Sequence, residues 1–336
     1  MIDIEKTFQK ENRKEIKGSL GEKIFLLNNN NIMSFEGESL FIYNIENLQL
    51  ITKFQFDKRI LDIIQLKTEE ILVLTPCEIT MMDGKSYKIL SKRGMKGKNY
   101  DMHYGDECES SPERMFQLSD STIAFVYNAA FNIDICQKSE ENQLIYIKTI
   151  ETKGYCYSAC EIGDNNIAFN STENYKIESY DILFSHNDKI IKDLYLSVER
   201  DALFYSKEKN LLAAIGVYLY FIDLNKYEVI KEYPIGRFLV GGNYIDFKVY
   251  KNYIFVSVYN LYIFDLENLE LTKMFDFKIH TMGDWLPPVL RTLFLDDKAY
   301  LYFKGRLGGY HKDYSSGLMK YSFHNRFTRI YNIIYK

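Results

Sequence analysis

The hydrophobic positions of this chain repeat as a unit of short alternating strands. Within residues 40–51, 219–230 and 261–272, an apolar strand leads to Asp or Asn, then to a short polar turn and a second alternating strand. Such alternation of apolar and polar residues indicates half-buried β-strands. Self-similarity at a fixed period is typical of repeat architectures. The pattern therefore predicts an all-β repeat protein.

The Asp or Asn that ends the repeated strand sets the period. Its clearest positions are Asn44, Asp83, Asp181, Asp223 and Asp265, with Asp134 and Ser322 as weaker candidates. Where no insertion intervenes, neighbouring positions are about 40 residues apart, which matches four short strands and their turns. The longer gaps contain identifiable insertions.

Seven such units fill the chain from residue 21 to residue 336. They cover approximately residues 21–56, 57–92, 114–150, 155–197, 200–235, 243–278 and 289–336. Sheets arranged radially bury each inner face against a neighbour and leave no free end. We expect a single domain with the fold of a seven-bladed β-propeller of four-stranded antiparallel blades. The competing architecture, two stacked β-sandwiches, predicts a linker and a change of composition near the middle, and the sequence contains neither.

The step from the third strand of a unit into its turn resembles the WD-repeat family of propellers, in which an aromatic or apolar residue precedes Asp. The corresponding pairs here are Tyr43-Asn44, Met82-Asp83, Tyr180-Asp181, Ile222-Asp223 and Phe264-Asp265. The resemblance covers nearly the whole chain and implies a WD-like propeller. No unit carries Trp before its Asp, and no convincing Gly-His pair opens the units, so that family's structural hydrogen-bond network is not implied.

Residues 1–20 precede the first unit and are rich in charge, which predicts an N-terminal arm or a short helix. In WD-repeat proteins an N-terminal strand often completes the closing blade. The last unit, however, contains a fourth apolar segment of its own at residues 327–335. This segment favours closure of the ring without the arm.

The amino-acid composition supports β structure and disfavours one class of partner. Aromatic residues make up 15% of the chain, mostly Tyr and Phe, and these suit a pleated surface. Their enrichment together with Ile, Asn and Lys is equally expected from nucleotide bias, so the tyrosines are not interpreted as a ligand signature. The net charge of -4 disfavours nucleic acid as the main partner. The chain has no apolar run that could span a bilayer and no secretory signal at its start, so we expect a cytoplasmic protein.

Five cysteines are scattered through the sequence without a CxxC pair. They are Cys77, Cys108, Cys136, Cys156 and Cys160. An odd and dispersed set suits a reducing compartment. Cys156 and Cys160 are four residues apart, and we interpret them as small buried apolar residues rather than zinc ligands.

The longest connections are predicted to lie on one face of the ring. Strand direction reverses at every turn, so links between units and links between second and third strands leave from the same side. The connections on that side include residues 93–113, 278–289, 305–316 and 234–242. Long loops on rigid scaffolds are where binding usually evolves, so we expect the working face there.

Five residues on that face are candidate partner contacts. They are Arg93, His103, Trp285, Arg306 and Tyr310. Arg93 belongs to a basic run, from Lys85 to Lys98, that precedes an acidic run from Asp101 to Glu113. The two halves either bind separate ions or neutralise each other in a solvated loop. Trp285 stands close to two prolines and is either a rigid interface anchor or a plug over a blade junction. Arg306 and Tyr310 lie among glycines that form either an anion-binding nest or a flexible hairpin tip.

Two functions are compatible with these features. No nucleophile elbow, zinc-hydrolase helix or kinase motif set is present, which favours a non-catalytic scaffold or adaptor that holds a protein or peptide within an assembly, without a metal or cofactor. The alternative is a propeller enzyme or small-ligand receptor, for example a metal-assisted hydrolase. It requires His103, His280 and His311 to converge with Asp101 or Asp106 at the mouth of the channel.

Overall fold

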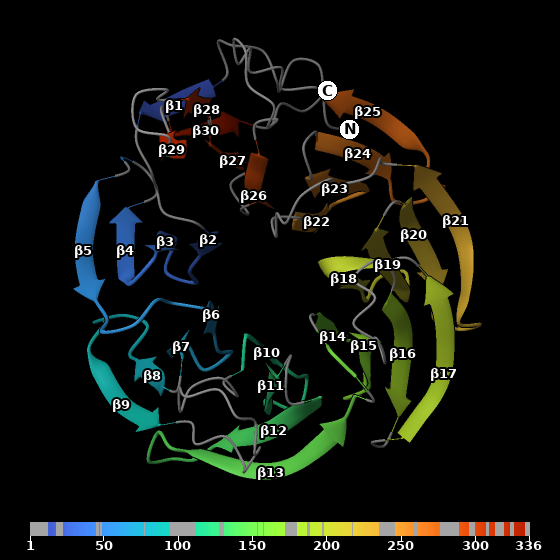
Figure 1. The fold of residues 1–336 in the computed structure, drawn as a ribbon, viewed down its shortest axis with the longest axis horizontal. Helices are drawn as coiled ribbons and strands as arrows, with labels where there is room; N and C mark the ends of the chain where they lie inside the picture. The colour runs from blue at the N-terminus through green and yellow to red at the C-terminus, as the bar shows by residue number, and fades with distance from the viewer. Residues whose placement is uncertain are drawn as a thin grey trace.

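The computed structural model describes most strands and turns of the chain. The described residues are 13–17, 23–44, 47, 49–76, 78–94, 112–127, 131–152, 154–156, 158–171, 180–186, 189–196, 198–216, 218–234, 246–257, 261–275, 289–295, 300–306, 309–312, 319–322 and 326–332. They form seven four-stranded antiparallel sheets and one two-stranded hairpin. The seven sheets stand around a central axis, each with its strands stacked from the axis to the rim (Figure 1). The predicted fold class, an all-β propeller, is confirmed.

The first three blades follow chain order from the axis outward. Blade one contains β2 (Lys23–Leu26), β3 (Asn31–Glu36), β4 (Ser39–Asn44) and β5 (Leu50–Gln55). Blade two contains β6 (Asp62–Gln65), β7 (Ile71–Thr75), β8 (Glu78–Met82) and β9 (Ile89–Gly94). Blade three contains β10 (Arg114–Gln117), β11 (Ile123–Tyr127), β12 (Asn132–Lys138) and β13 (Leu144–Glu151).

The next three blades repeat this order. Blade four contains β14 (Ala159–Glu161), β15 (Ile167–Ser171), β16 (Tyr180–His186) and β17 (Lys189–Leu196). Blade five contains β18 (Val198–Ser206), β19 (Leu211–Gly216), β20 (Tyr218–Asp223) and β21 (Glu228–Pro234). Blade six contains β22 (Asp246–Tyr250), β23 (Tyr253–Ser257), β24 (Leu261–Asp265) and β25 (Leu271–Phe275).

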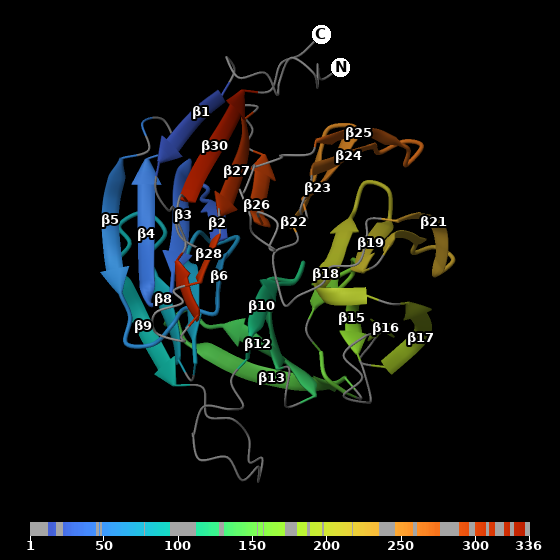
Figure 2. The same cartoon turned by 45° about the horizontal axis from the view of Figure 1, so that its top comes forward.

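The closing blade is built from both ends of the chain. Its strands from the axis outward are β26 (Val289–Leu295), β27 (Tyr300–Arg306), β30 (Arg326–Asn332) and β1 (Arg13–Lys17). The expectation that the last unit supplies its own fourth strand is therefore wrong. The residues between β27 and β30 instead contain a separate hairpin of β28 (Gly309–Lys312) and β29 (Met319–Ser322), so the outer position is left for β1. Figure 2 shows β1 alongside β30.

The core lies between neighbouring blades because each sheet buries both of its faces. The second strands β7, β11 and β15 are buried at every position, and their sequences are nearly continuous apolar runs. One cluster joins blades one and two through residues such as Met33 and Val73, and another joins blades two and three through Leu72 and Phe125. The outer strands, in contrast, alternate between partly and fully exposed residues.

The repeated Asp or Asn stabilises the turn between the third and fourth strands. The carboxylate of Asp83 accepts hydrogen bonds from the backbone N–H and the hydroxyl of Ser86, both at 2.6 Å. These bonds hold the pKa of Asp83 below its usual value. Asp223 and Asp265 accept hydrogen bonds from the backbone N–H two residues on, in Asn225 and Glu267, each at 2.8 Å. Such Asx-type bonds are local, which explains why the residue recurs.

Two of the residues aligned to this turn are misplaced. Asp181 is the second residue of β16, and Asp134 lies inside β12, so neither reaches the end of its strand. In blade three the turn is instead stabilised by Ser139, whose hydroxyl oxygen accepts a bond of 3.1 Å from the N–H of Gln143. The better marker is a bulge near the end of the third strand, present in blades one to six.

A repeated hydrogen bond connects the turn between the first and second strands of one blade to the next blade, with a backbone N–H as donor and a side-chain oxygen as acceptor. The N–H of Asn28 donates to the side-chain oxygen of Gln65 at 2.8 Å, and the N–H of Lys67 donates to Gln117 at 2.7 Å. The N–H of Ser119 donates to Glu161 at 3.0 Å. Gln65, Gln117 and Glu161 each end the first strand of their blade. These bonds link blades one to four in series. They lie on the side of the ring that carries the turns between first and second and between third and fourth strands, which we call the turn side.

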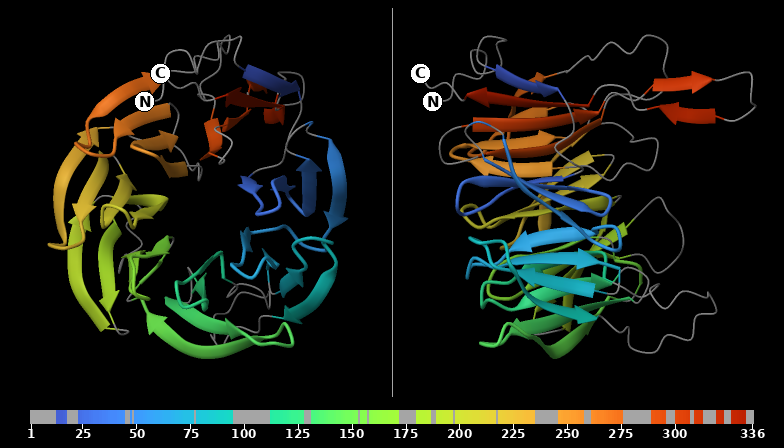
Figure 3. Two further views of the ribbon diagram at one scale, coloured as in Figure 1. Left: turned by 180° about the vertical axis from the view of Figure 1, so that it is seen from behind. Right: turned by 90° about the vertical axis from the view of Figure 1, so that its left-hand side faces the viewer.

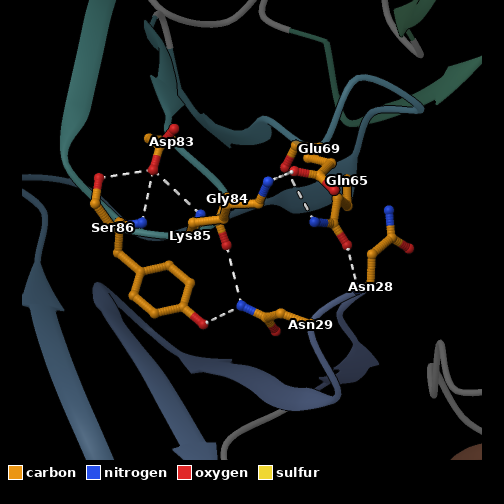
Figure 4. A network of polar contacts seen from close by, with 9 residues as sticks. Asn28, Asn29, Gln65, Glu69, Asp83, Gly84, Lys85 and Ser86 are labelled. Atoms are coloured by element: carbon orange, nitrogen blue, oxygen red, sulfur yellow. Dashed lines mark hydrogen bonds and ion pairs between the residues drawn. The ribbon is translucent and has the colours of Figure 1, made fainter.

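The turn of blade two also requires a glycine. Gly84 packs against the backbone of Glu69, and a Cβ at this position would lie 2.0 Å from the Glu69 carbonyl oxygen. The same approach places the Gly84 carbonyl where it accepts a bond of 3.1 Å from the Asn29 side chain (Figure 4). The ion pair between Lys85 and Glu69, at 2.8 Å, reinforces it.

Removal of residues 1–17 is expected to lower the midpoint of thermal unfolding sharply. The deletion removes all five residue pairs between β1 and β30 and exposes the edge of β30. Deletion of residues 1–12 alone is the matched control, because it leaves β1 intact. Equal unfolding midpoints for the two deletions, measured by circular dichroism, would contradict closure through β1.

Gly84→Ala is expected to destabilise the protein by about 3 kcal/mol, because the new Cβ overlaps the backbone of Glu69. Gly37→Ala is the comparison, since a Cβ there meets no atom within 4 Å and only the left-handed φ of 56° opposes it. That substitution should cost about 1 kcal/mol. Urea unfolding of both variants measures the difference.

Candidate functional site

The long connections leave the ring on one side, opposite the short turns that carry the repeated Asp or Asn. In the antiparallel blades, the last residues of second and fourth strands lie on that side, which we call the loop face. Gly94, Pro234 and Arg306 are such last residues. Most of the loops themselves, at residues 95–111, 235–245, 276–288 and 313–318, lie outside the described residues.

The hairpin β28–β29 belongs to this face. It extends from the closing blade beyond the ends of the other strands (Figure 3, right). Tyr310 lies in β28 and pairs with Tyr321 of β29, while Arg306 ends β27 and pairs with Arg326. Because β27 pairs directly with β30, the hairpin is an addition to the blade rather than part of its sheet.

The five candidate contacts are distributed over several elements. Arg93 lies in β9, Arg306 in β27 and Tyr310 in β28, so three of them come from blades two and seven. His103 and Trp285 lie outside the described residues, and their place on the loop face stays a prediction. His311 lies in β28, whereas His103, His280, Asp101 and Asp106 lie outside the described residues, so the convergence of these side chains also stays a prediction.

The basic run before the first insertion is partly neutralised within blade two. Lys85 pairs with Glu69 at 2.8 Å, and Lys92 pairs with Glu78 at 3.1 Å. Arg93 is exposed, and in the described part of the chain its guanidinium has no ion-pair partner. Of these three cations, only Arg93 presents an uncompensated charge to the described surface.

A groove of about 540 Å³ lies beside Arg93, between the outer strands of blades two and three. Its lining residues are Ile79, Met81, Ser91, Lys92, Arg93 and the segment 142–146. Ile79 and Met81 are buried, whereas Ile145 and Tyr146 have exposed fractions of 55% and 41%. The groove therefore combines apolar surface with one unpaired cation, an arrangement common in ligand sites.

The charge of Arg93 also acts on the interface behind the groove. Burial raises the pKa of the Tyr127 hydroxyl, and the Asp134 carboxylate raises it further, while Arg93 opposes the shift. Burial likewise raises the pKa of the Cys136 thiol to about 11, with the same two charges acting in opposite directions. Asp134 accepts bonds from Asn132 at 3.0 Å and Thr149 at 2.5 Å.

The described thiols are unsuited to nucleophilic chemistry. Cys136, Cys156 and Cys160 are free, and burial raises the pKa of each. A thiol must lose its proton before it attacks or ligates a metal. Over the described ranges, no three His, Cys, Asp or Glu side chains gather into a metal-binding group. Nor does this part of the chain include a helix long and apolar enough to cross a membrane.

The groove was only partly accessible to sequence reasoning. Arg93 was identified because it borders the longest insertion, whereas Ile79, Met81 and the segment 142–146 were not. Their relation to Arg93 depends on how the outer strands of two blades face each other. Finding these residues requires the register of the fourth strands relative to the bulge, and the periodicity of the sequence does not reveal that register.

Comparisons with known proteins identify the fold and not a family. No family model matches the sequence, and no curated protein matches it either. The structure matches 1224 chains of solved structures, so the architecture is shared widely. One of them is dihydro-heme d1 dehydrogenase NirN in complex with DHE, at 11% identity and a TM-score of 0.60. The match covers 92% of this chain and 67% of the NirN chain.

Alkylation by iodoacetamide at pH 8 is expected to be slow at Cys136, Cys156 and Cys160 in the native protein. With a pKa of about 11, only about one Cys136 thiol in a thousand is ionised at that pH. Peptide mapping by mass spectrometry measures the rates, and denatured protein provides the control. Native labelling at the denatured rate would show that these thiols are accessible and reactive.

Proposed function

We propose that this protein is a non-catalytic scaffold or adaptor that holds a protein or peptide on its loop face. The hairpin β28–β29 is the observation that carries the proposal. A two-stranded hairpin is marginally stable alone, and the closing blade does not need it because β27 pairs with β30. An element that contributes no strand to the ring yet extends from its face is suited to contact a partner.

The candidate contacts on this face are Arg93, His103, Trp285, Arg306 and Tyr310. Arginine and aromatic residues are the types that dominate binding energy at protein interfaces. The WD-like repeat pattern supports an interaction role, although the chain lacks the Trp that precedes Asp in that family. In this proposal the protein acts in the cytoplasm as one component of a larger complex and needs no cofactor.

A small-ligand or enzymatic role is the second candidate. The structural neighbour NirN carries a dehydrogenase name and is described in complex with DHE. At 11% identity the likeness extends to the fold, so a ligand at the channel mouth of this chain requires its own evidence. Elemental analysis of protein purified from its native source separates the two candidates. A stoichiometric metal ion favours the second, and metal-free protein bound to another polypeptide favours the first.

Replacement of residues 307–325 by Asn-Gly should abolish partner capture and leave the ring intact. Arg306 and Arg326 are directly paired, so a two-residue turn joins β27 to β30 without strain. Tyr310→Ala and Trp285→Ala are each expected to weaken binding by about 2 kcal/mol while thermal unfolding changes little.

Affinity purification from the native source, followed by mass spectrometry, identifies the partner, and titration with that partner quantifies the loss. Tyr227→Ala, in the turn between β20 and β21 of blade five and so on the side of the ring opposite the loop face, is the matched tyrosine control. Undiminished capture by the variant without the hairpin, and by Trp285→Ala, would contradict the assignment of the loop face.

A further inference from the structure

The groove between blades two and three lies beside two residues of β9, Ser91 and Arg93, which we compare with their counterparts in the other blades. Radial sheets diverge outward, so neighbouring blades pack closely near the axis and leave wedges at the rim. Side chains of the fourth strands must fill these wedges. The bulge before each third turn provides a fixed reference for comparing them between blades.

One column of fourth-strand positions can be compared between blades by its distance from this bulge. In blade one the bulge follows Ile42 of the third strand, and Phe54 of the fourth strand pairs with Leu40, two residues before Ile42. The column contains the residue at the same place in each of blades one to six. Its members are Phe54, Arg93, Ile150, Leu194, Tyr233 and Phe275. Five of the six are apolar or aromatic, and Arg93 is the single charged residue among them.

The other members whose side chains are described close their wedges. Phe54 packs against the core between blades one and two, and Ile150 has an exposed fraction of 4% in the core between blades three and four. Leu194 packs against the cluster that spans blades four to six. The ring of Tyr233 lies 5.0 Å from that of Phe264, and its hydroxyl donates to Glu270 at 3.2 Å. Arg93 is exposed instead.

A second substitution in the same wedge leaves space beside Arg93. In blade five, Lys231 crosses to blade six, where its ammonium group donates to the Asn268 carbonyl and to Glu270. The corresponding residue in blade two is Ser91, whose hydroxyl donates to the Asn142 carbonyl at 2.7 Å. Ser91 is shorter than Lys231 and cannot reach as far toward the next blade, and the groove lies beside it.

The residues that line the groove indicate which kind of ligand it binds. Arg93 supplies a cation that has no ion-pair partner among the described residues, whereas the neighbouring Lys92 is paired with Glu78. Ile79 and Met81 form an apolar floor, and Ile145 and Tyr146 form an apolar side. Strand β9 is the last strand of its sheet, so in the described part of the chain its outer edge has unpaired backbone groups.

We propose that this groove binds an extended acidic segment of a partner protein, with a carboxylate on Arg93 and an apolar side chain against Ile79, Met81 and Tyr146. A peptide strand uses free backbone groups for affinity and alternate side chains for specificity. The guanidinium fork of arginine matches a carboxylate with two parallel hydrogen bonds. The inference rests on the proposed function and adds a lateral binding site to the loop face.

The test uses the full chain and an acetylated, amidated hexapeptide of alternating Val and Glu, titrated by NMR at low salt. A peptide of alternating Val and Gln should bind at least about tenfold more weakly, which corresponds to about 1.4 kcal/mol. Arg93→Gln should weaken binding of the acidic peptide by the same factor. Lys53→Gln, which removes the exposed cation adjacent to Phe54 in blade one, is the matched control and should bind as the native chain does.

Arg93→Phe restores the aromatic residue found in this column in blade one. It should abolish peptide binding and raise the midpoint of thermal unfolding, because the ring fills the wedge. A lower unfolding midpoint for this variant would contradict the claim that position 93 belongs to the column whose side chains fill the space between blades. Native affinity in Arg93→Gln, or the absence of binding of the acidic peptide, would overturn the proposed ligand.

Two further variants separate this inference from the proposed function. The chain without the hairpin should still bind the acidic peptide even when it has lost its native partner, and loss of peptide binding there would contradict a separate groove. Replacement of residues 98–110 by a Gly-Ser linker tests the chain's own acidic segment as the ligand. If the peptide binds only to that variant, the chain's own acidic segment occupies the groove, and the proposal that a partner protein binds there is wrong.

Discussion

Burial of sheet faces between neighbouring blades is the constraint on which the structure depends. A single four-stranded sheet of this sequence has two apolar faces, as the fully buried strands β7, β11 and β15 demonstrate. Such a sheet is stable only between two others, so the row of sheets must close on itself. The pairing of β1 with β30 closes the ring by hydrogen bonds, because it places strands from both ends of the chain in one blade.

The two faces of the ring are consequently used in different ways. On the turn side, Gln65, Gln117 and Glu161 are engaged in bonds to the preceding blade, and Gly84 has no room for a side chain. Substitutions there disturb contacts between blades. The other face carries the links whose length the blades do not restrict, so a hairpin such as β28–β29 is added without altering a sheet.

The fold could be predicted because its repeated features are local. Asn44, Asp83, Asp223 and Asp265 recur since each stabilises a turn within two or three residues of itself. Asp134 and Asp181 misled the alignment because an Asp inside a strand looks the same in sequence as one at its end. The role of β1 was missed because an apolar segment near the C-terminus resembles a fourth strand, and its true position depends on pairing across the whole chain.

Arg93 illustrates the same limit for the candidate site. Its place beside an insertion was visible in the sequence, but its meaning comes from the column that it shares with Phe54, Ile150 and Tyr233. In a repeat protein, equivalent positions of different units can be compared with one another. The residue type found in most units shows what packing requires at that position. Where a unit departs from that requirement and leaves a groove, packing no longer explains the residue. Since the fold is shared by so many solved chains, we expect the function particular to this chain to depend on such departures.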